Sequence, residues 1–198
     1  MPFIDTIPDS DIDGDIRAMY ERQRAHWGFV PNYARVFSHR PEVMALWAQL
    51  QAGIRKHMDK RRFELVTFAA AHALRSTLCS LAHGRTLTEF FSMQDVQSMA
   101  RGEAPASLSP AEAEMMSFSR QVARDAANVT RDDVERLKQH GFTDAEIFDI
   151  SATAAARSFW TKLLESLGVE PEPSLRTMNP EFVRAMTAGR AVDFGDAK

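Results

Sequence analysis

The sequence predicts an all-α protein built as a helical bundle, and three observations support this fold class. Apolar residues recur at spacings of three and four over long stretches, which is the repeat of a helix with one buried face. Helix-start signals precede these stretches, with Ser109, Thr130 and Thr143 each followed three residues later by an acid. Alternation of apolar and polar residues bounded by turn signals, which predicts strands, is hard to find.

The first predicted helix lies within DSDIDGDIRAMYERQRAHWGF, where Ile16, Met19 and Tyr20 share one face. Gly28 is a suitable stop for this helix. We expect residues 29–40 to form an extended link to the next helix, because Pro31-Asn32 interrupts the helical pattern.

Three more helices are predicted before residue 91. Pro41 suits the first turn of a helix, whose apolar stripe comprises Val43, Leu46, Trp47, Leu50 and Ile54. Asp59 can cap the next helix, which carries Phe63, Val66, Ala70 and Leu74. Ser76 interrupts it, and the helix that follows carries Cys79, Leu81, His83, Leu87 and Phe90.

The second half repeats this pattern after a connection rich in proline and small residues at 101–110. One helix begins at Ser109, a short amphipathic one runs from Thr130 to Gly141, and a long apolar one runs from Thr143 to Gly168. We therefore expect one domain over residues 1–170, including an N-terminal arm. Residues 171–198 are expected to be an extension, with a weak helix, that packs on the same or a neighbouring subunit.

Composition excludes several classes of function. The net charge of −3 and the isoelectric point near 6.1 give no reason to expect nucleic acid as a partner. No apolar run approaches the ~20 residues that a membrane span needs, and MPFIDTIPDSDID does not resemble a secretory signal. The single cysteine cannot form a disulfide within the chain, which fits a reducing cytoplasm. We expect a cytoplasmic protein that binds neither nucleic acid nor membrane.

That cysteine, Cys79, lies in a pattern that indicates a reactive thiol. If Ser76 caps the helix, Cys79 occupies the third helical position, where free backbone amides and the helix dipole favour a thiolate. His83 follows four residues later on the same face, one turn away, where it can exchange a proton with the thiol. If the chain turns near residues 75–76, Glu64 can come back to orient His83, directly or through a water.

Simpler interpretations stay open for these residues. A free cysteine is often a small buried hydrophobe, and Glu64 could lie on a solvated face, paired with Lys60 or Arg61. A metal site of Cys79, His83 and His72 has too little of the usual ligand spacing, so we expect no metal. The aromatic residues Trp27, Phe29, Tyr33 and Phe37 could wall a pocket over Cys79 or anchor the N-terminal arm, and we favour the anchor.

The order and spacing of Glu64, Ser76, Cys79 and His83 resemble the signature of the AhpD-like alkylhydroperoxidase family within the carboxymuconolactone decarboxylase superfamily. The stretches FIDTIP, YERQRAHWGFVPNYARVFSHRPEVM and GFTDAEIFDISATAAARSFWTKLLESLGVE resemble its peroxidase-related branch, so the resemblance covers about residues 3–170. It implies an all-helical, oligomeric protein.

The resemblance implies that Cys79 attacks a peroxide, that His83 is its proton partner and that Glu64 acts as base through a relay. Ser76 stands where the family has its first, resolving cysteine, so no disulfide can form within the chain and an external thiol must reduce the sulfenic acid. Thr161-Lys162 replaces an Asn-Arg pair that is frequent in the family.

Three hypotheses follow. The first is a one-cysteine peroxidase that takes a hydroperoxide and an external thiol reductant, works as a homo-oligomer and needs no cofactor. The second is a non-redox enzyme like carboxymuconolactone decarboxylase, in which His83 and Glu64 transfer protons. The third is a catalytically degenerate relative. We favour the first.

Overall fold

In the computed structural model, which describes residues 2–192, every regular element is a helix, as the sequence predicts. The first half comprises η1 (Asp9–Asp11), α1 (Gly14–Trp27), α2 (Asn32–Val36), η2 (Phe37–His39), α3 (Pro41–Arg55), α4 (Lys60–Ala73) and α5 (Thr77–Leu87). The second half comprises α6 (Met93–Ala100), α7 (Pro110–Asp125), η3 (Ala126–Asn128), α8 (Arg131–Gln139), α9 (Asp144–Ser166), α10 (Pro173–Arg176) and α11 (Pro180–Met186).

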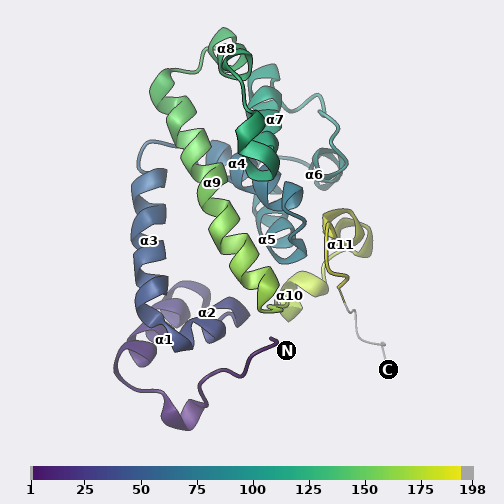
Figure 1. Cartoon of the computed structure of the whole chain (residues 1–198). Helices are drawn as coiled ribbons and strands as arrows, with labels where there is room; N and C mark the ends of the chain where they lie inside the picture. The colour runs from purple at the N-terminus through teal and green to yellow at the C-terminus, as the bar shows by residue number, and fades with distance from the viewer. Residues whose placement is uncertain (1, 193–198) are drawn as a thin grey trace.

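Helix α4 is the centre of the bundle, and it packs against α5, α7 and α9 (Figure 1). Its sequence explains this position, because FELVTFAAA has apolar or small residues all round the helix, and all of these side chains are buried. The long helix α9 crosses the molecule and also contacts α3 and α7.

The helix boundaries confirm most of the start and stop signals. Gly28 ends α1 with a left-handed φ of 81°, a conformation that glycine adopts without steric cost. Pro41 opens α3, and the side chain of Asp59 caps α4. Capping boxes are present at Ser109, Thr130 and Thr143. Met93–Ala100, which the sequence analysis did not assign, forms α6 behind a Ser92 cap.

The prediction of an extended link at 29–40 was wrong. Pro31 is extended and precedes α2, and a 3₁₀ turn continues the chain to His39. The turn forms because Ala34, Val36 and Phe37 bury their side chains against the bundle. The amide of Asn32, which has no acceptor within α2 because it lies at the start of the helix, donates to the carboxylate of Glu172, which lies 140 positions later in the sequence.

The buried residues form two hydrophobic clusters, and α5 contributes to both. The larger cluster, built mainly from α4, α6, α7, the first half of α9 and α11, includes Leu81 and Leu87. It also buries Met99, Met115 and Met116, so these methionines are core residues. The smaller cluster, built from α1–α3 and the second half of α9, includes Leu78 and Cys79.

The described part of the C-terminal extension packs on its own chain. Phe182, Val183 and Met186 of α11 are fully buried in the larger cluster. Beyond α11, the chain passes so close to the α4–α5 turn that a Cβ on Gly189 would lie 1.8 Å from the carbonyl oxygen of Arg75. Residues 193–198 of the predicted extension lie outside the described residues.

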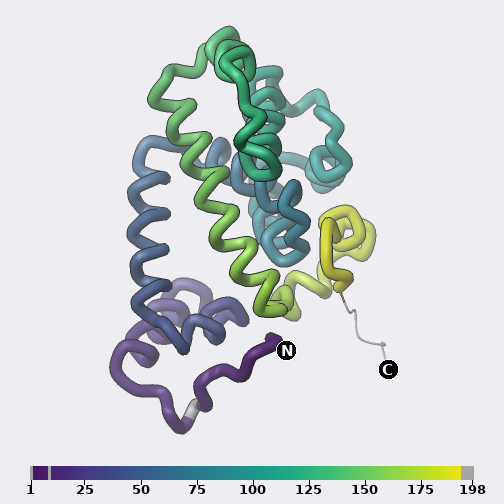
Figure 2. The backbone as a smooth tube through the Cα atoms, viewed as in Figure 1, coloured from purple at the N-terminus to yellow at the C-terminus, as the bar shows by residue number. Residues whose placement is uncertain are grey.

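The N-terminal arm runs back beneath the bundle to the end of α9 (Figure 2), where the Phe3 amide donates to the Leu167 carbonyl at 2.8 Å. This hydrogen bond therefore joins the start of the chain to the C-terminal end of α9. None of the helices within residues 2–192 combines the length and the apolar character that crossing a membrane requires.

Candidate active site

A tight turn between α4 and α5 sets the geometry of the candidate site. Arg75 adopts a left-handed φ of 60°, which is uncommon for a residue with a side chain. The amide of Ser76 then donates to the Ala71 carbonyl at 3.1 Å, which closes the end of α4. The turn sends α5 back along α4, as expected if Glu64 is to approach the thiol helix.

Ser76 caps α5 and holds Cys79 at the third helical position, as the sequence predicts. Its hydroxyl oxygen accepts a hydrogen bond from the Cys79 amide at 3.3 Å. The same hydroxyl donates to Oε1 of Glu165 on α9 at 2.7 Å. The side chain of Ser76 therefore ties the start of the thiol helix to α9.

Glu64 of α4 pairs with His83, which lies one turn after Cys79 on α5 and is partly buried. Oε2 of Glu64 lies 2.7 Å from Nδ1 of His83, and the Glu64 residue is only 6% exposed. An ionised carboxylate only accepts hydrogen bonds, so Nδ1 carries the proton and donates it. In the neutral ring, Nε2 is then the free base.

Electrostatics keep this pair in the form of carboxylate and neutral imidazole. Burial lowers the pKa of His83, and the repulsion from Arg157 and Arg55 adds to that effect, while the attraction of Glu64 opposes it. For Glu64, burial acts to raise the pKa, but attraction and hydrogen bonding from His83, with Arg157 and Arg55 nearby, leave its pKa lowered. At neutral pH, His83 can therefore accept a proton.

The thiol of Cys79 is buried, with the residue 3% exposed, and polar side chains of α9 interact with it. The hydroxyl of Thr161 donates to Sγ at 3.8 Å. Arg157, one turn earlier on α9, interacts electrostatically with both Cys79 and Glu64. His83 lies one helical turn from Cys79 and has its hydrogen bond with Glu64.

Aromatic side chains form a wall beside the thiol. Trp160 stacks on Phe37 and on Trp47, with ring centroids 5.2 Å and 5.0 Å apart, and Tyr33 packs against its edge. Phe37, Trp47 and Trp160 belong to the same buried cluster as Cys79. Two of the four aromatic residues that the sequence singled out thus contribute to this region.

The other two lie elsewhere, because Trp27 and Phe29 are 52% and 42% exposed. Phe37 lies in the cluster that holds Cys79, and the same cluster contains Met19 and Tyr20 of α1, so the anchoring role that we favoured stays a prediction for Phe37. We call Tyr33, Phe37, Trp47 and Trp160 the aromatic wall.

The simpler interpretation of Glu64 was wrong. Lys60 and Arg61, its proposed surface partners, pair instead with Glu89 and Glu112, while Glu64 is buried. His72 lies away from Cys79, with Arg120, Arg124 and the backbone of Ala185 as its neighbours. It therefore does not join Cys79 and His83 in a ligand set.

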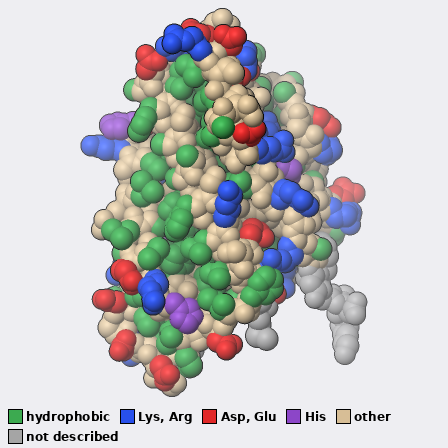
Figure 3. All heavy atoms as spheres, in the orientation of Figure 1, with side chains coloured by type: hydrophobic (Ala, Val, Ile, Leu, Met, Phe, Trp, Pro, Cys, Tyr) green, Lys and Arg blue, Asp and Glu red, His purple; other side chains and the backbone are tan. Residues whose placement is uncertain are grey.

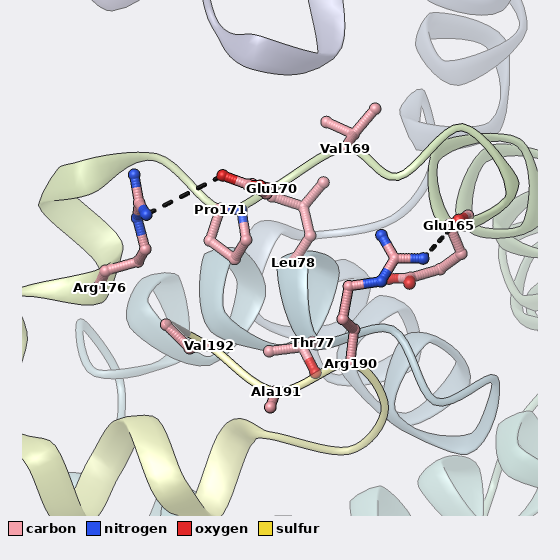
Figure 4. A pocket seen from close by; sticks show the side chains of 10 residues that line it. All are labelled: Thr77, Leu78, Glu165, Val169, Glu170, Pro171, Arg176, Arg190, Ala191 and Val192. Atoms are coloured by element: carbon pink, nitrogen blue, oxygen red, sulfur yellow. Dashed lines mark hydrogen bonds and ion pairs between the residues drawn. The ribbon is translucent and has the colours of Figure 1, made fainter. Parts of the chain in front are cut away.

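A small hollow of about 70 Å³ lies at the N-terminal end of α5 (Figure 4). Thr77 and Leu78 line it from α5, Glu165 from α9, and Arg176 and Arg190 from the C-terminal extension. Arg190 reaches across to donate to the Glu165 carbonyl at 3.0 Å. Cys79 itself is not part of the lining.

Sequence reasoning missed Arg157 and gave Thr161 no role. Both lie on the buried face of α9 with Thr153, Ala154, Trp160 and Leu164. A signal was available, because Arg157 is the charged residue that falls on the three- and four-residue apolar spacing of this helix. A charge at such a position is seldom left buried without an electrostatic partner.

Comparisons with known proteins identify the fold. No protein-family model matches the chain, and no curated protein matches its sequence. A peroxidase-related protein from Ralstonia eutropha JMP134, described as an alkylhydroperoxidase AhpD core, superposes with a TM-score of 0.76 at 23% identity. The match covers 96% of this chain and 98% of that one.

Two further solved structures are similar. A peroxidase-related protein from Silicibacter sp. TM1040 has a TM-score of 0.68 at 19% identity, over 88% of this chain and 91% of that one. The debrominase Bmp8 has a TM-score of 0.74 at 13% identity, over 93% and 97%. A cysteine-to-alanine variant of Bmp8 was solved with 2,3,4-tribromopyrrole. The chain therefore has the all-helical AhpD-like fold of the peroxidase-related proteins.

Proposed function

We propose that the protein reduces organic hydroperoxides through the single cysteine Cys79, with an external thiol as reductant. The observation that carries the proposal is the Glu64–His83 hydrogen bond of 2.7 Å, buried one turn from the thiol. A buried carboxylate that fixes the tautomer of a neutral imidazole is the arrangement that activates a nucleophile. The fold shared with AhpD-core proteins supports the same reading.

The chemistry balances with the residues present. Nε2 of His83 takes the thiol proton, and the thiolate attacks the terminal oxygen of the peroxide. An S–O bond forms as the O–O bond breaks, so the sulfur is oxidised to a sulfenic acid and the peroxide is reduced. The departing alkoxide takes the proton back from His83 and leaves as an alcohol.

Because Ser76 replaces a second thiol, it determines how the sulfenic acid on Cys79 is reduced. A hydroxyl cannot condense with a sulfenic acid to form a disulfide, and Cys79 is the only cysteine in the chain. A first external thiol therefore condenses with the sulfenic acid and releases water, giving a mixed disulfide. A second thiol attacks this bond, restores Cys79 and leaves as the oxidised disulfide.

The hollow beside Ser76 is the docking place that we propose for this reductant. Thr77, the neighbour of Ser76 in the chain, lines it, and its charged lining residues are Arg176, Arg190, Glu165 and Glu170.

Self-association is part of the proposal. Hydrophobic side chains gather on the face formed by α3 and α9 (Figure 3). Four large ones are exposed there, namely Leu46, Leu50, Phe148 and Phe159, at 62%, 51%, 71% and 48%. Phe159 also packs on Trp47 of the aromatic wall, 5.7 Å between ring centroids. A second copy covering this face would bury the patch and shield the site from water.

The test is consumption of cumene hydroperoxide in the presence of a monothiol, with Cys79→Ser as the matched control. We expect the wild type to consume peroxide and oxidise two equivalents of thiol per peroxide, and the control to do neither. A rate that survives in Cys79→Ser would overturn the proposal. A second arm with 2,3,4-tribromopyrrole asks whether bromide is released. Bromide release without peroxide consumption would contradict the proposed substrate class.

A further inference from the structure

Arg157 is a buried cation that the mechanism above leaves unexplained. It projects from the apolar stretch AAARSFW of α9 and is only 6% exposed. Within residues 2–192, its Nε–H has no hydrogen-bond acceptor. A buried guanidinium with an unused donor is costly, so such groups are generally retained where an anion or a strong acceptor meets them.

The surroundings of Arg157 place it at the reacting sulfur. Thr161, one turn later on the same face of α9, contacts Sγ of Cys79. Arg157 interacts electrostatically with Cys79 and Glu64, and its guanidinium carbon lies 5.9 Å from the ring centre of Trp47. The cation therefore lies between the thiol, the Glu64–His83 pair and the aromatic wall.

A buried positive charge beside the thiol favours its ionised form. Arg157 is buried, whereas Arg55, which also acts on the Glu64–His83 pair, is exposed to solvent. The histidine is kept neutral by burial. Arg157 interacts electrostatically with both Glu64 and Cys79, so it would stabilise a thiolate at Cys79.

We propose that Arg157 is a catalytic residue that stabilises the Cys79 thiolate and uses its free Nε–H to bind the oxygen that departs from the peroxide. Binding of the departing oxygen rests on the proposed function, whereas stabilisation of the thiolate does not. His83 then supplies and accepts the proton, while Arg157 carries the charge. Burial lowers the pKa of Arg157, but an arginine starts from so high a value that the guanidinium stays protonated near neutral pH.

The direct test compares alkylation of Cys79 by two small reagents, neutral iodoacetamide and anionic iodoacetate, in Arg157→Gln and Arg157→Lys. Arg62→Gln is the matched control, since Arg62 is a surface arginine paired with Glu146. In Arg157→Gln we expect both rates at pH 7 to fall by about tenfold or more and to recover as the pH is raised. At high pH, the preference for iodoacetate over iodoacetamide should also fall.

Arg157→Lys separates the two roles. It retains the charge but lacks the Nε donor, so we expect it to restore alkylation and not the rate with cumene hydroperoxide. Far-UV circular dichroism checks that each variant is folded, and if Arg157→Gln does not fold, Arg157→Lys still tests the leaving-group role through its rate with cumene hydroperoxide. Alkylation that is unchanged across pH in a folded Arg157→Gln overturns the proposal.

The alkylation measurement requires no peroxide. It therefore tests thiolate stabilisation by Arg157 separately from the proposed peroxidase activity. Loss of alkylation in Arg157→Gln, with no peroxide consumed by the wild type, supports thiolate stabilisation and rejects the peroxidase. Full peroxide turnover by Arg157→Lys overturns the leaving-group role.

Discussion

The two sides of Cys79 carry the same kind of contact with different chemistry. On one side, the Ser76 hydroxyl donates to Glu165, and on the other the His83 imidazole donates to Glu64, each at 2.7 Å. Both pairs link α5 to a carboxylate on a neighbouring helix. Only the His83 side has an imidazole, which can accept and release a proton, and Glu64 is buried whereas Glu165 is partly exposed. The comparison suggests that the His83 side moves protons, while the Ser76 side positions the helix.

The largest effect on peroxide consumption should come from replacing Glu64, and the same change at Glu165 serves as the comparison. In Glu64→Gln, His83 loses the acceptor that fixes its tautomer, so we expect peroxide consumption to fall by about 100-fold. Glu165→Gln is the matched change on the other side and should leave the rate within a few-fold. Steady-state rates at pH 7 measure both variants. Equal losses in the two would remove the distinction between the sides.

Replacing the hydroxyl by a thiol should give the Ser76 side a chemical role. Ser76 is at the helix cap three residues before Cys79, which is the spacing of a dithiol motif. In Ser76→Cys, we expect peroxide to produce an intramolecular disulfide, so that trapping of sulfenic acid at Cys79 declines. Mass spectrometry of the peroxide-treated variant measures both species. Continued accumulation of sulfenic acid would show that position 76 cannot reach Sγ.

The pH dependence of stability offers a third comparison. Burial lowers the pKa of His83 in the folded chain, so the unfolded chain binds more protons as the pH falls below about 6.5. The stability that the neutral ring contributes is present above that pH and is lost on acidification. The slope for one proton is at most about 1.4 kcal/mol per pH unit. Urea unfolding between pH 7.5 and 5.5 should therefore show a smaller slope in His83→Gln than in the wild type. His72, whose pKa burial also lowers, is unchanged in both proteins.

The smallest effect should be structural. Ser76→Ala removes the cap of α5 and should cost about 1 kcal/mol in the free energy of unfolding. The pH dependence of Cys79 alkylation should stay close to that of the wild type. A large change in that dependence would mean that the Ser76 side also tunes the thiol.

The sequence was sufficient for the helices because their signals are local. Caps at Asp59, Ser109 and Thr143 lie within three residues of the groups they satisfy. It failed at residues 29–40, where α2 is held by burial and by Glu172, a partner 140 positions away. Such contacts leave no local pattern.

In the candidate site, too, local signals were readable from the sequence and contacts between distant residues were not. Ser76, Cys79 and His83 lie within eight residues, so spacing alone placed them on one helix face. The pairing of Glu64 with His83 depended on the turn at Arg75, which the sequence analysis could only infer. Arg157 and Thr161 reach the thiol from a helix about 80 residues away, and only their position on the buried stripe of α9 indicates them.

The most direct measurement of the central claim is the trapping of sulfenic acid on Cys79. The wild type and Glu64→Gln would be treated with one equivalent of cumene hydroperoxide in the presence of dimedone, and the adduct followed by mass spectrometry. The account predicts prompt formation of one adduct per wild-type chain, on the peptide that contains Cys79, and much slower formation in Glu64→Gln. A wild-type thiol that survives the peroxide unmodified, in a folded protein, would contradict it.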